Sequence, residues 1–360
     1  MKKLKIGIIG VGRLGYEHAC NIANRVPGSG LVAIADANFD RAKQVAEELG
    51  VTAVYNDPKE LCADPNVEAV AIITNTASHV EMIKIAMDAG KHVFCEKPLA
   101  DTVEKCKEAE AIIAAHPELT FMLGFMRRYD HSYQVAKKKM ENGDIGDVIL
   151  VRCYSQDPIS IIEGTLEYAP RSGGQFIDMS IHDFDLIRWL TGSEVKELWA
   201  TGGCYEFKQY KDWDDGDNVS GLMKMENDAM AFFFAGRAAA HGSHVETEIV
   251  GTRSTLRIAF VPTDSPVEVM SRCGICRVCY TAFLFHIQFI LSYLYSSLQT
   301  EYKYNFLRKR TEGTWTLLSF CFPSHQTILK NPKGRSFERP LGLWKDLTFV
   351  RPIALVFTAA

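Results

Sequence analysis

The sequence lacks a strong excess of charge of either sign. It contains 40 lysine and arginine residues against 44 aspartate and glutamate residues, a formal net charge of −4 at pH 7. Proteins that bind the phosphate backbone of nucleic acids usually carry a positive excess. We therefore expect no nucleic-acid partner.

The N-terminal segment lacks a long apolar run. The apolar stretch at residues 6–9 is shorter than the core of a secretory signal, and it leads directly into a glycine-rich turn. The ten cysteines are spread along the chain. We expect a cytoplasmic protein whose thiols are mostly reduced and packed as small apolar side chains.

What the sequence does have is length and apolar content. Its 360 residues, of which 47% are hydrophobic, are enough for two domains with buried cores. The charge changes sign along the chain, because residues 1–270 carry a balance of −12 and residues 271–360 a balance of +8. This shift indicates a boundary near residue 270.

A dinucleotide-binding fingerprint follows the first predicted strand, at residues 5–9. Gly10, Gly12 and Gly15 have the G-x-G-x-x-G spacing, a helical stretch follows, and an apolar run at residues 31–35 ends at Asp36. The fingerprint requires this order of strand, glycine loop, helix, strand and acid. A chance cluster of glycines in a turn would lack the flanking elements.

Each position of the fingerprint has a physical role. Gly10 permits the tight turn, Gly12 lets the backbone approach the pyrophosphate, and Gly15 lets the helix pack on the strand. The helix N-terminus offers free N–H groups to the phosphates. Asp36 can accept hydrogen bonds from the adenosine ribose and would repel a 2′-phosphate, which favours NAD, although the nearby Arg41 leaves NADP open.

Strands and helices continue to alternate beyond the fingerprint. Strands are predicted at residues 69–73, 92–95 and 120–124, and helices at residues 40–49, 78–89 and 103–115. This order predicts an α/β fold with a doubly wound parallel sheet, a Rossmann domain spanning residues 1–123. Ligands bind such sheets beyond the C-terminal ends of the strands. We expect NAD to bind at Gly10, Gly12, Arg13, Leu14, Gly15, Asp36, Thr74, Asn75 and Glu96.

Lys97 is the first catalytic candidate. It follows Glu96 at a predicted strand end, at the depth where a nicotinamide ring should lie, and Pro98 restricts its backbone to an extended form. Most lysines in loops are simply surface residues. The position of Lys97, rather than its residue type, supports a role in the chemistry.

Asp178, His182 and Asp185 form the second group of candidates. Residues 173–190 are typical of one helix, in which the i, i+4, i+7 spacing puts these three side chains on one face. They are either satisfied by internal partners or face a cleft. In a cleft, His182 can take a hydroxyl proton as hydride leaves the carbon, and Asp178 can orient its ring. A zinc site is a rival, but no H-E-x-x-H or tight Cys/His set accompanies these residues, so we expect no metal.

These motifs together resemble the glucose–fructose oxidoreductase/inositol dehydrogenase/MocA family, and within it the inositol 2-dehydrogenases. The resemblance rests on the glycine loop, Asp36, residues 96–98, residues 124–129 and residues 173–189, and it covers about residues 4–270. It implies a Rossmann domain followed by an α/β domain with an open sheet that faces partner subunits, usually in a tetramer or dimer.

The resemblance also implies roles for individual residues. Lys97 and His182 would act together on the substrate hydroxyl, with Asp178 orienting His182 and touching the sugar. Arg127 and Asp185 match positions that hold polyol hydroxyls, and Gln156 and Asp157 lie in the corresponding substrate loop. The implied reaction is the oxidation of myo-inositol to 2-inosose with NAD. Related members use glucose, scyllo-inositol or other sugars.

The second half of the chain has the pattern of a mostly antiparallel sheet. Strand-like runs occur at residues 147–154, 221–226, 229–235, 245–250 and 255–258. The apolar face of such a sheet would need covering, which favours a homo-oligomer. We assign residues 124–270 to a substrate and oligomerisation domain of α/β type.

The resemblance stops near residue 270. Residues 278–300 carry no charge and are long enough to span a bilayer, but their polar side chains favour a packed helix. Cys273, Cys276 and Cys279 have no clear fourth metal ligand. Residues 271–360 form an atypical tail, which we interpret as the product of a reading-frame change, a retained intron or a divergent exon.

The sequence therefore predicts a dehydrogenase rather than a regulator. A cofactor-binding regulator of the same fold typically lacks the lysine or the Asp/His pair, whereas this chain has Lys97, Asp178 and His182. A membrane-tethered form is a second rival, through residues 278–300.

Overall fold

The computed structural model describes residues 3–258 and the two short strands 310–311 and 314–315. The tail's possible membrane helix and its cysteine cluster lie outside the described residues. Within the described part, no helix is both long and apolar enough to cross a membrane. The chain divides into two compact units, the first ending at Tyr129 and the second beginning at Asp130.

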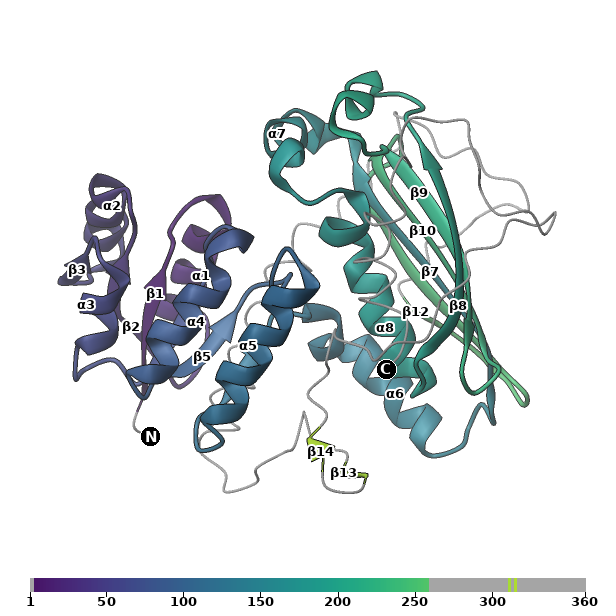
Figure 1. Ribbon diagram of the computed structural model, residues 1–360, viewed down its shortest axis with the longest axis horizontal. Coiled ribbons are helices and arrows are strands. Elements are labelled where there is room, and N and C mark those ends of the chain that lie inside the picture. Colours follow the sequence, from purple (N-terminus) through teal and green to yellow (C-terminus); the bar gives the residue numbers. More distant parts are fainter. Residues whose placement is uncertain (1–2, 259–309, 312–313, 316–360) are drawn as a thin grey trace. The chain divides into compact units, whose positions relative to one another are not determined.

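The first unit is a parallel sheet with the strand order β3-β2-β1-β4-β5-β6 (Figure 1). This is the order of a dinucleotide-binding fold, so the predicted Rossmann architecture is confirmed. Its strands are β1 (Leu4–Ile9), β2 (Ser29–Ala35), β3 (Ala53–Tyr55), β4 (Ala69–Ile72), β5 (His92–Cys95) and β6 (Phe121–Leu123). Its helices are α1 (Arg13–Asn24), α2 (Phe39–Leu49), α3 (Pro58–Ala63), α4 (His79–Asp88) and α5 (Val103–Ala115).

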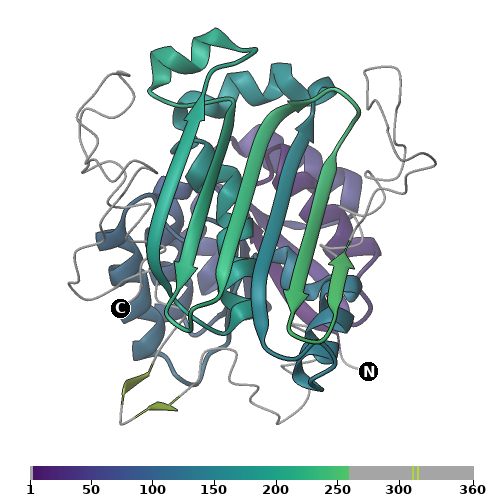
Figure 2. The same cartoon turned by 90° about the vertical axis from the view of Figure 1, so that its right-hand side faces the viewer.

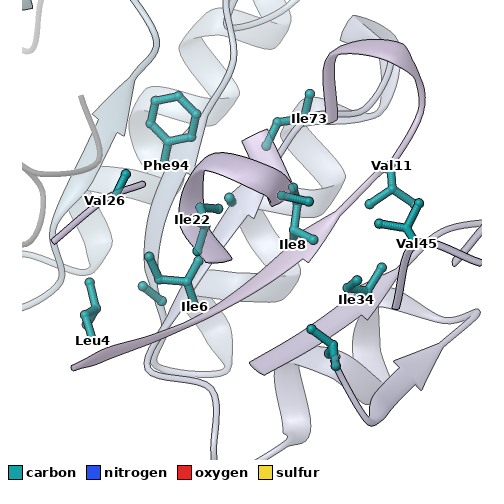
Figure 3. Packing of buried hydrophobic residues seen from close by; sticks show 14 of the residues in the cluster. Leu4, Ile6, Ile8, Val11, Ile22, Val26, Ile34, Val45, Ile73 and Phe94 are labelled. Atoms are coloured by element: carbon teal, nitrogen blue, oxygen red, sulfur yellow. The ribbon is translucent and has the colours of Figure 1, made fainter. Parts of the chain in front are cut away.

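The core of this unit explains why its strands are almost entirely apolar. Ile6, Ile8 and Ile34 are at most 1% exposed and pack against Ile22 of α1 and Val45 of α2 (Figure 3). A strand that is covered by helices must be apolar on both faces. The helices are capped by side chains where the sequence provides them, as at Asn38 before α2 and Thr102 before α5.

The second unit is an open sheet with the strand order β12-β11-β7-β10-β9-β8. All neighbouring strands are antiparallel except β7 and β10, which confirms the mostly antiparallel sheet. Its strands are β7 (Val148–Pro158), β8 (Val195–Gly203), β9 (Asn218–Met225), β10 (Met230–Ala239), β11 (His244–Gly251) and β12 (Thr255–Ile258). Its helices are α6 (His131–Glu141), α7 (Ile162–Tyr168) and α8 (Ile181–Thr191).

Helix α8 covers one face of this sheet, where the ring of Phe184 lies 4.7 Å from that of Phe233. Figure 2 looks onto the opposite face, with no described helix of this unit in front of it. Paired residues of neighbouring strands share a face. Trp199, Leu222, Phe232 and Phe234 therefore all lie on this open face.

The helix predicted at residues 173–190 differs from a regular α-helix at its start. Residues Phe176–Ser180 form a π-helical turn, and the regular helix α8 begins only at Ile181. Gly173 and Gly174, both with positive φ, precede the turn, and the Gln175 N–H donates to the Asp215 carboxylate at 3.0 Å. These contacts fix a wide first turn, which the residue spacing alone does not indicate. Such turns occur frequently at functional sites.

Candidate active site

The glycine loop between β1 and α1 has the geometry that a dinucleotide requires. Gly10 has a φ of +90°, and a Cβ there would lie 2.4 Å from the Ile73 carbonyl oxygen. A Cβ on Gly15 would lie 2.0 Å from the Gly10 carbonyl oxygen. Gly12 is exposed, and a Cβ there would meet nothing within 4 Å. The protein's own backbone requires glycine at Gly10 and Gly15. At Gly12 the protein leaves room for a side chain, so glycine there instead leaves space for a ligand to approach the backbone.

The N-terminus of α1 is the second feature that fits a pyrophosphate. The helix begins at Arg13, its N-cap is Gly12, and no side chain caps it. Arg13 is exposed and Leu14 is half-buried. The backbone N–H groups of this first turn have no side-chain cap, which fits the cofactor-binding role expected for Gly12 through Gly15.

Asp36 is held against the glycine loop. Its Oδ2 accepts a hydrogen bond from the Val11 N–H at 2.7 Å, and its Oδ1 accepts one from the Asn38 N–H at 2.8 Å. Each carboxylate oxygen keeps a second lone pair for a ribose hydroxyl. Arg41 donates to the Val11 carbonyl at 3.2 Å and lies over the Tyr16 ring at 5.1 Å. The residues of the loop thus fit NAD.

Thr74 and Asn75 follow β4, where the sequence placed them, and the Thr74 hydroxyl accepts a hydrogen bond from Ser78 at 2.8 Å. His79, which the sequence analysis missed, lies beneath them. Its Nδ1 is 2.8 Å from the Pro98 carbonyl and its Nε2 is 3.3 Å from the Thr74 carbonyl. Burial lowers the pKa of His79, although these two hydrogen bonds oppose the shift. One imidazole therefore connects the loop after β4 with the loop after β5.

Glu96 and Lys97 follow β5, and Glu96 is occupied by the protein itself. Its Oε1 is hydrogen-bonded to the Nε2 of His18 at 2.9 Å, and its Oε2 accepts the Lys97 N–H at 3.0 Å. Burial raises the pKa of Glu96, but the bond to His18 and the charges of His18 and Lys97 outweigh it, so the pKa lies below its usual value. Glu96 was predicted to bind NAD. In this structure the Glu96 carboxylate instead fixes the backbone of Lys97 through the hydrogen bond to its N–H.

The peptide bond between Lys97 and Pro98 is cis. Lys97 itself is half-buried. Arg127 lies at the end of the first unit, in the short turn Met126–Tyr129, and is 6% exposed. A buried arginine at a strand end is consistent with the predicted substrate contact, but its sequence context alone did not show that it would be buried.

The predicted catalytic pair of the second unit, Asp178 and His182, begins in the π-helical turn and continues into α8. Asp178 and His182 are both half-buried, whereas Asp185 is only 2% exposed. The three side chains therefore differ in their exposure to solvent, although their spacing in the sequence predicted that they share one face of a helix. The neighbouring Asp183 is fully buried and accepts a hydrogen bond from the Ser155 hydroxyl at 2.6 Å.

Arg237, from β10, is a residue of this region that the sequence analysis missed. Its Nη2 donates to Asp178 Oδ2 at 2.6 Å, and its Nη1 lies 3.1 Å from the Tyr168 hydroxyl and 3.5 Å from Asp157 Oδ2. The Tyr168 hydroxyl donates to Asp178 Oδ2 at 2.6 Å. Burial alone would lower the pKa of Arg237. The interactions with Asp178, Tyr168 and Asp157 outweigh this effect and raise the pKa above its usual value, so the guanidinium is charged. No local pattern identified Arg237, because its partners are 59 and 69 residues away in the chain.

Gln156 and Asp157, predicted as neighbours in a substrate loop, lie on opposite faces of β7. Gln156 is paired with His244, and its Nε2 is 3.5 Å from the His244 ring on the open face. Asp157 is on the face that α8 covers, within reach of Arg237. Of the two, only Asp157 belongs to the same group of side chains as Asp178. On the open face, His244 also lies 3.2 Å from His241 and 3.4 Å from Glu246.

Among the described residues, no group of three or more histidine, cysteine, aspartate or glutamate side chains could hold a metal ion. The described groups that can take part in chemistry include an amine, an imidazole, carboxylates and an uncapped helix N-terminus.

Comparisons with known proteins agree with this geometry. A family model described as "Oxidoreductase family, NAD-binding Rossmann fold" of the GFO/IDH/MocA group matches residues 4–125, and the C-terminal domain model of the same group matches residues 133–257. The myo-inositol 2-dehydrogenase of Thermotoga maritima is 36% identical over 260 residues, which are 70% of this chain and 74% of that protein. The NAD(+)-dependent scyllo-inositol 2-dehydrogenase of Bacillus subtilis is 34% identical over 258 residues, 71% of this chain and 74% of that protein.

A solved structure gives the same result. The scyllo-inositol dehydrogenase from Lactobacillus casei, with bound NAD(H) and scyllo-inositol, superposes with a TM-score of 0.73 at 41% sequence identity. The match covers 82% of this chain and 90% of that one.

Proposed function

Because this chain belongs to the GFO/IDH/MocA family of oxidoreductases with an NAD-binding Rossmann fold, we propose that it oxidises one hydroxyl of a cyclic polyol, with NAD as the hydride acceptor. The first candidate substrate is myo-inositol, which would yield 2-inosose. The observation that carries this proposal is the likeness to an inositol dehydrogenase structure that holds both NAD(H) and an inositol. The same likeness makes scyllo-inositol the second candidate.

NAD, when bound, supplies the acceptor for the hydride that leaves the hydroxyl-bearing carbon. Gly10, Gly12, Arg13, Leu14 and Gly15 would hold its pyrophosphate and Asp36 its adenosine ribose, with Thr74, Asn75 and Glu96 at the nicotinamide end. The negative charge of Asp36, fixed beside Val11, supports NAD over a cofactor with a 2′-phosphate.

Lys97, His182 and Asp178 are the proposed catalytic residues. The amine of Lys97 would bind the reacting hydroxyl oxygen and stabilise the charge that develops on it. The imidazole of His182 would take the hydroxyl proton as the C–H bond breaks and the C=O bond forms. Asp178 would orient that imidazole. Arg127, Asp157 and Asp185 are the proposed substrate-binding residues, whereas Gln156, which the sequence grouped with them, lies beside His244 on the open face of the sheet.

We further propose a homo-oligomer, a tetramer or dimer, formed through the open face of the second sheet. Leu222 is 53% exposed and Met230 is 50% exposed on this face, beside the rings of Phe232 and Phe234. Exposed apolar side chains grouped in this way are unfavourable in water and are usually covered by a partner, whereas the β7–β11 part of the same face carries the ion pair of Arg152 and Glu246. In this assignment, residues 1–123 bind NAD and residues 124–270 bind substrate and partner subunits.

A cytoplasmic location is also part of the proposal. The cysteines within the described residues are free thiols, and all except Cys20 are buried. Burial raises the pKa of the Cys62 thiol to about 11, so this thiol is unreactive. Free buried thiols are typical of a reducing compartment.

The proposal is tested by measuring NADH formation with the purified full chain, NAD and a panel of myo-inositol, scyllo-inositol and glucose. We expect turnover with an inositol, and loss of turnover with retained NAD binding in Lys97→Met. Lys105→Met is the matched control, because Lys105 is an exposed lysine whose amine pairs with the exposed Asp101. NAD binding without turnover on any polyol would instead favour a regulator.

A further inference from the structure

Arg237 is a deeply buried cation that contacts the proposed catalytic residue Asp178, and no role in the proposed reaction has yet been given to it. Its side chain is 1% exposed, whereas those of its ionic partners Asp178 and Asp157 are 17% and 32% exposed. Removing a guanidinium from water costs several kcal/mol unless it is well paired. The arrangement places a buried cation beneath two carboxylates that remain accessible.

The direction of the hydrogen bonds in this group follows from chemistry. A guanidinium can only donate, so the Tyr168 oxygen accepts from Arg237 and its own proton goes to Asp178 Oδ2. Burial and the Asp178 charge raise the pKa of Tyr168, which keeps the phenol protonated. Asp178 Oδ2 therefore receives two hydrogen bonds of 2.6 Å, one of them from a charged donor. These two bonds fix the orientation of the Asp178 carboxylate, which lies one helical turn before His182.

We propose that Arg237, with Tyr168, is a positioning residue that fixes Asp178 and sets the charge next to His182. This inference rests on the proposed function. The guanidinium offsets part of the negative charge of Asp157, Asp178 and the nearby Asp215, so the group keeps a reduced negative charge. That charge is enough to stabilise the imidazolium formed when His182 accepts the substrate proton. If these charges were not offset, they would instead hold a proton on His182, or on one of the carboxylates, before the substrate arrives.

The pH dependence of kcat/KM separates this role from a merely structural one. In Arg237→Met, loss of the cation favours a proton on His182, which blocks the base, so the acidic limb of the profile moves to higher pH, by about one pH unit or more. We expect kcat to fall by about a hundredfold, while the KM for NAD stays within about twofold. Arg237→Lys keeps the charge, so its acidic limb should return towards that of the wild type. Tyr168→Phe should shift the limb in the same direction as Arg237→Met, but less.

Arg188→Met is the matched control. Arg188 is also a buried arginine of the second unit, and it forms two 2.6 Å hydrogen bonds with Glu194. Its loss should lower Tm without moving the pH profile. If Arg237→Met does not fold, Tyr168→Phe and Arg237→Lys decide the question. The proposal would be overturned if the acidic limb did not shift in Tyr168→Phe but did shift in Arg237→Lys. Equal shifts in Arg237→Met and Arg188→Met would also overturn it.

A second measurement separates this inference from the proposed function. If the wild-type chain oxidises no polyol, the proposed function fails, but the Arg237–Asp178 contact can still be tested through Tm. We expect Arg237→Met combined with Asp178→Asn to lower Tm by less than the sum of the two single losses, because each single variant strands a buried partner. Additive losses would contradict the contact itself.

Discussion

His18 in α1 and Glu96 at the end of β5 form a hydrogen-bonded pair, with 2.9 Å between Nε2 and Oε1. The side chain of His18 is fully buried and that of Glu96 is 14% exposed. The other Glu96 oxygen holds the Lys97 N–H, so the pair connects the helix of the glycine loop to the proposed catalytic lysine. The carboxylate also packs closely against the backbone of Gly124, where a Cβ would lie only 3.0 Å from Glu96 Oε2. This close packing leaves the carboxylate little room to move.

Breaking this pair should destabilise the protein at neutral pH. His18→Leu leaves the Glu96 carboxylate largely buried without its imidazole, and we expect a loss of about 3 kcal/mol in the free energy of unfolding, measured by denaturant titration. The Glu96 pKa is lowered in the folded state from its ordinary 4.5, so this stabilisation is present above pH 4.5 and is lost as the pH falls through the folded pKa. The difference between variant and wild type should therefore shrink below pH 4.5.

The exposed pair Lys84–Asp88 is the control for burial. Its 2.6 Å ion pair is shorter, yet Lys84→Leu should cost far less stability than His18→Leu, because both side chains are more than half exposed. Equal losses in the two variants would show that the buried pair has no special importance.

His79 should make the stability depend on pH as well, in a range of pH above that in which Glu96 titrates. Its folded pKa is lowered from 6.5, so the unfolded chain binds a proton that the folded one does not. Stability should fall as the pH decreases from about 6.5 towards the folded pKa. Tm measured at several pH values should show a smaller decrease in His79→Asn, whereas a variant of the exposed His131, His131→Asn, should behave like the wild type. A decrease in His79→Asn that matches the wild type would contradict this assignment.

The charge of Asp36 should determine the choice of cofactor. Asp36→Asn keeps an oxygen for the Val11 N–H but removes the charge that would repel a 2′-phosphate. We expect the preference for NAD over NADP, measured as the ratio of their kcat/KM values, to fall by about tenfold or more. Asp40→Asn changes an exposed charge at the start of α2 and should leave the ratio unchanged. An unchanged ratio in Asp36→Asn would mean that shape, not charge, excludes NADP.

The open sheet face should control the oligomeric state. Leu222→Glu puts a charge among Trp199, Phe232 and the neighbouring apolar residues, and we expect it to shift the protein towards smaller species in analytical ultracentrifugation. Val135→Glu is the matched control, since Val135 is 41% exposed on α6 rather than on the sheet. A monomeric wild-type protein, or an oligomer unaffected by Leu222→Glu, would refute the proposed interface.

Much of the fold was predictable because its signals are local. The glycine loop and Asp36 lie within a single βαβ unit, and the apolar runs matched β1, β2, β4 and β5 to within two residues. Strand β8 was not predicted, since Trp199 and Leu198 stand among charged and small residues without a clear alternation. The wide turn at Phe176–Ser180 was not predicted either, because it depends on Asp215, 40 residues away from Gln175.

The candidate site divides in the same way. Lys97 and Asp36 could be found from strand ends, and Asp178 and His182 from helical spacing. Arg237 and His18 could not, since each acts through a partner far along the chain. Gln156 and Asp157 are adjacent in sequence, but a strand turns adjacent side chains to opposite faces. Only the register of β7 with β10 and β11 shows which face each residue takes.

The most direct test of the central claim is the fate of the hydrogen on the oxidised carbon. The full chain would be incubated with NAD and myo-inositol carrying deuterium at C2, or with scyllo-inositol carrying deuterium on its ring carbons, and the nicotinamide product would be analysed by mass spectrometry. We expect one deuterium to be transferred to the reduced nicotinamide for each inosose formed, and none with His182→Gln. Ketone formed without deuterium in the nicotinamide, or no ketone from either inositol, would contradict the central claim.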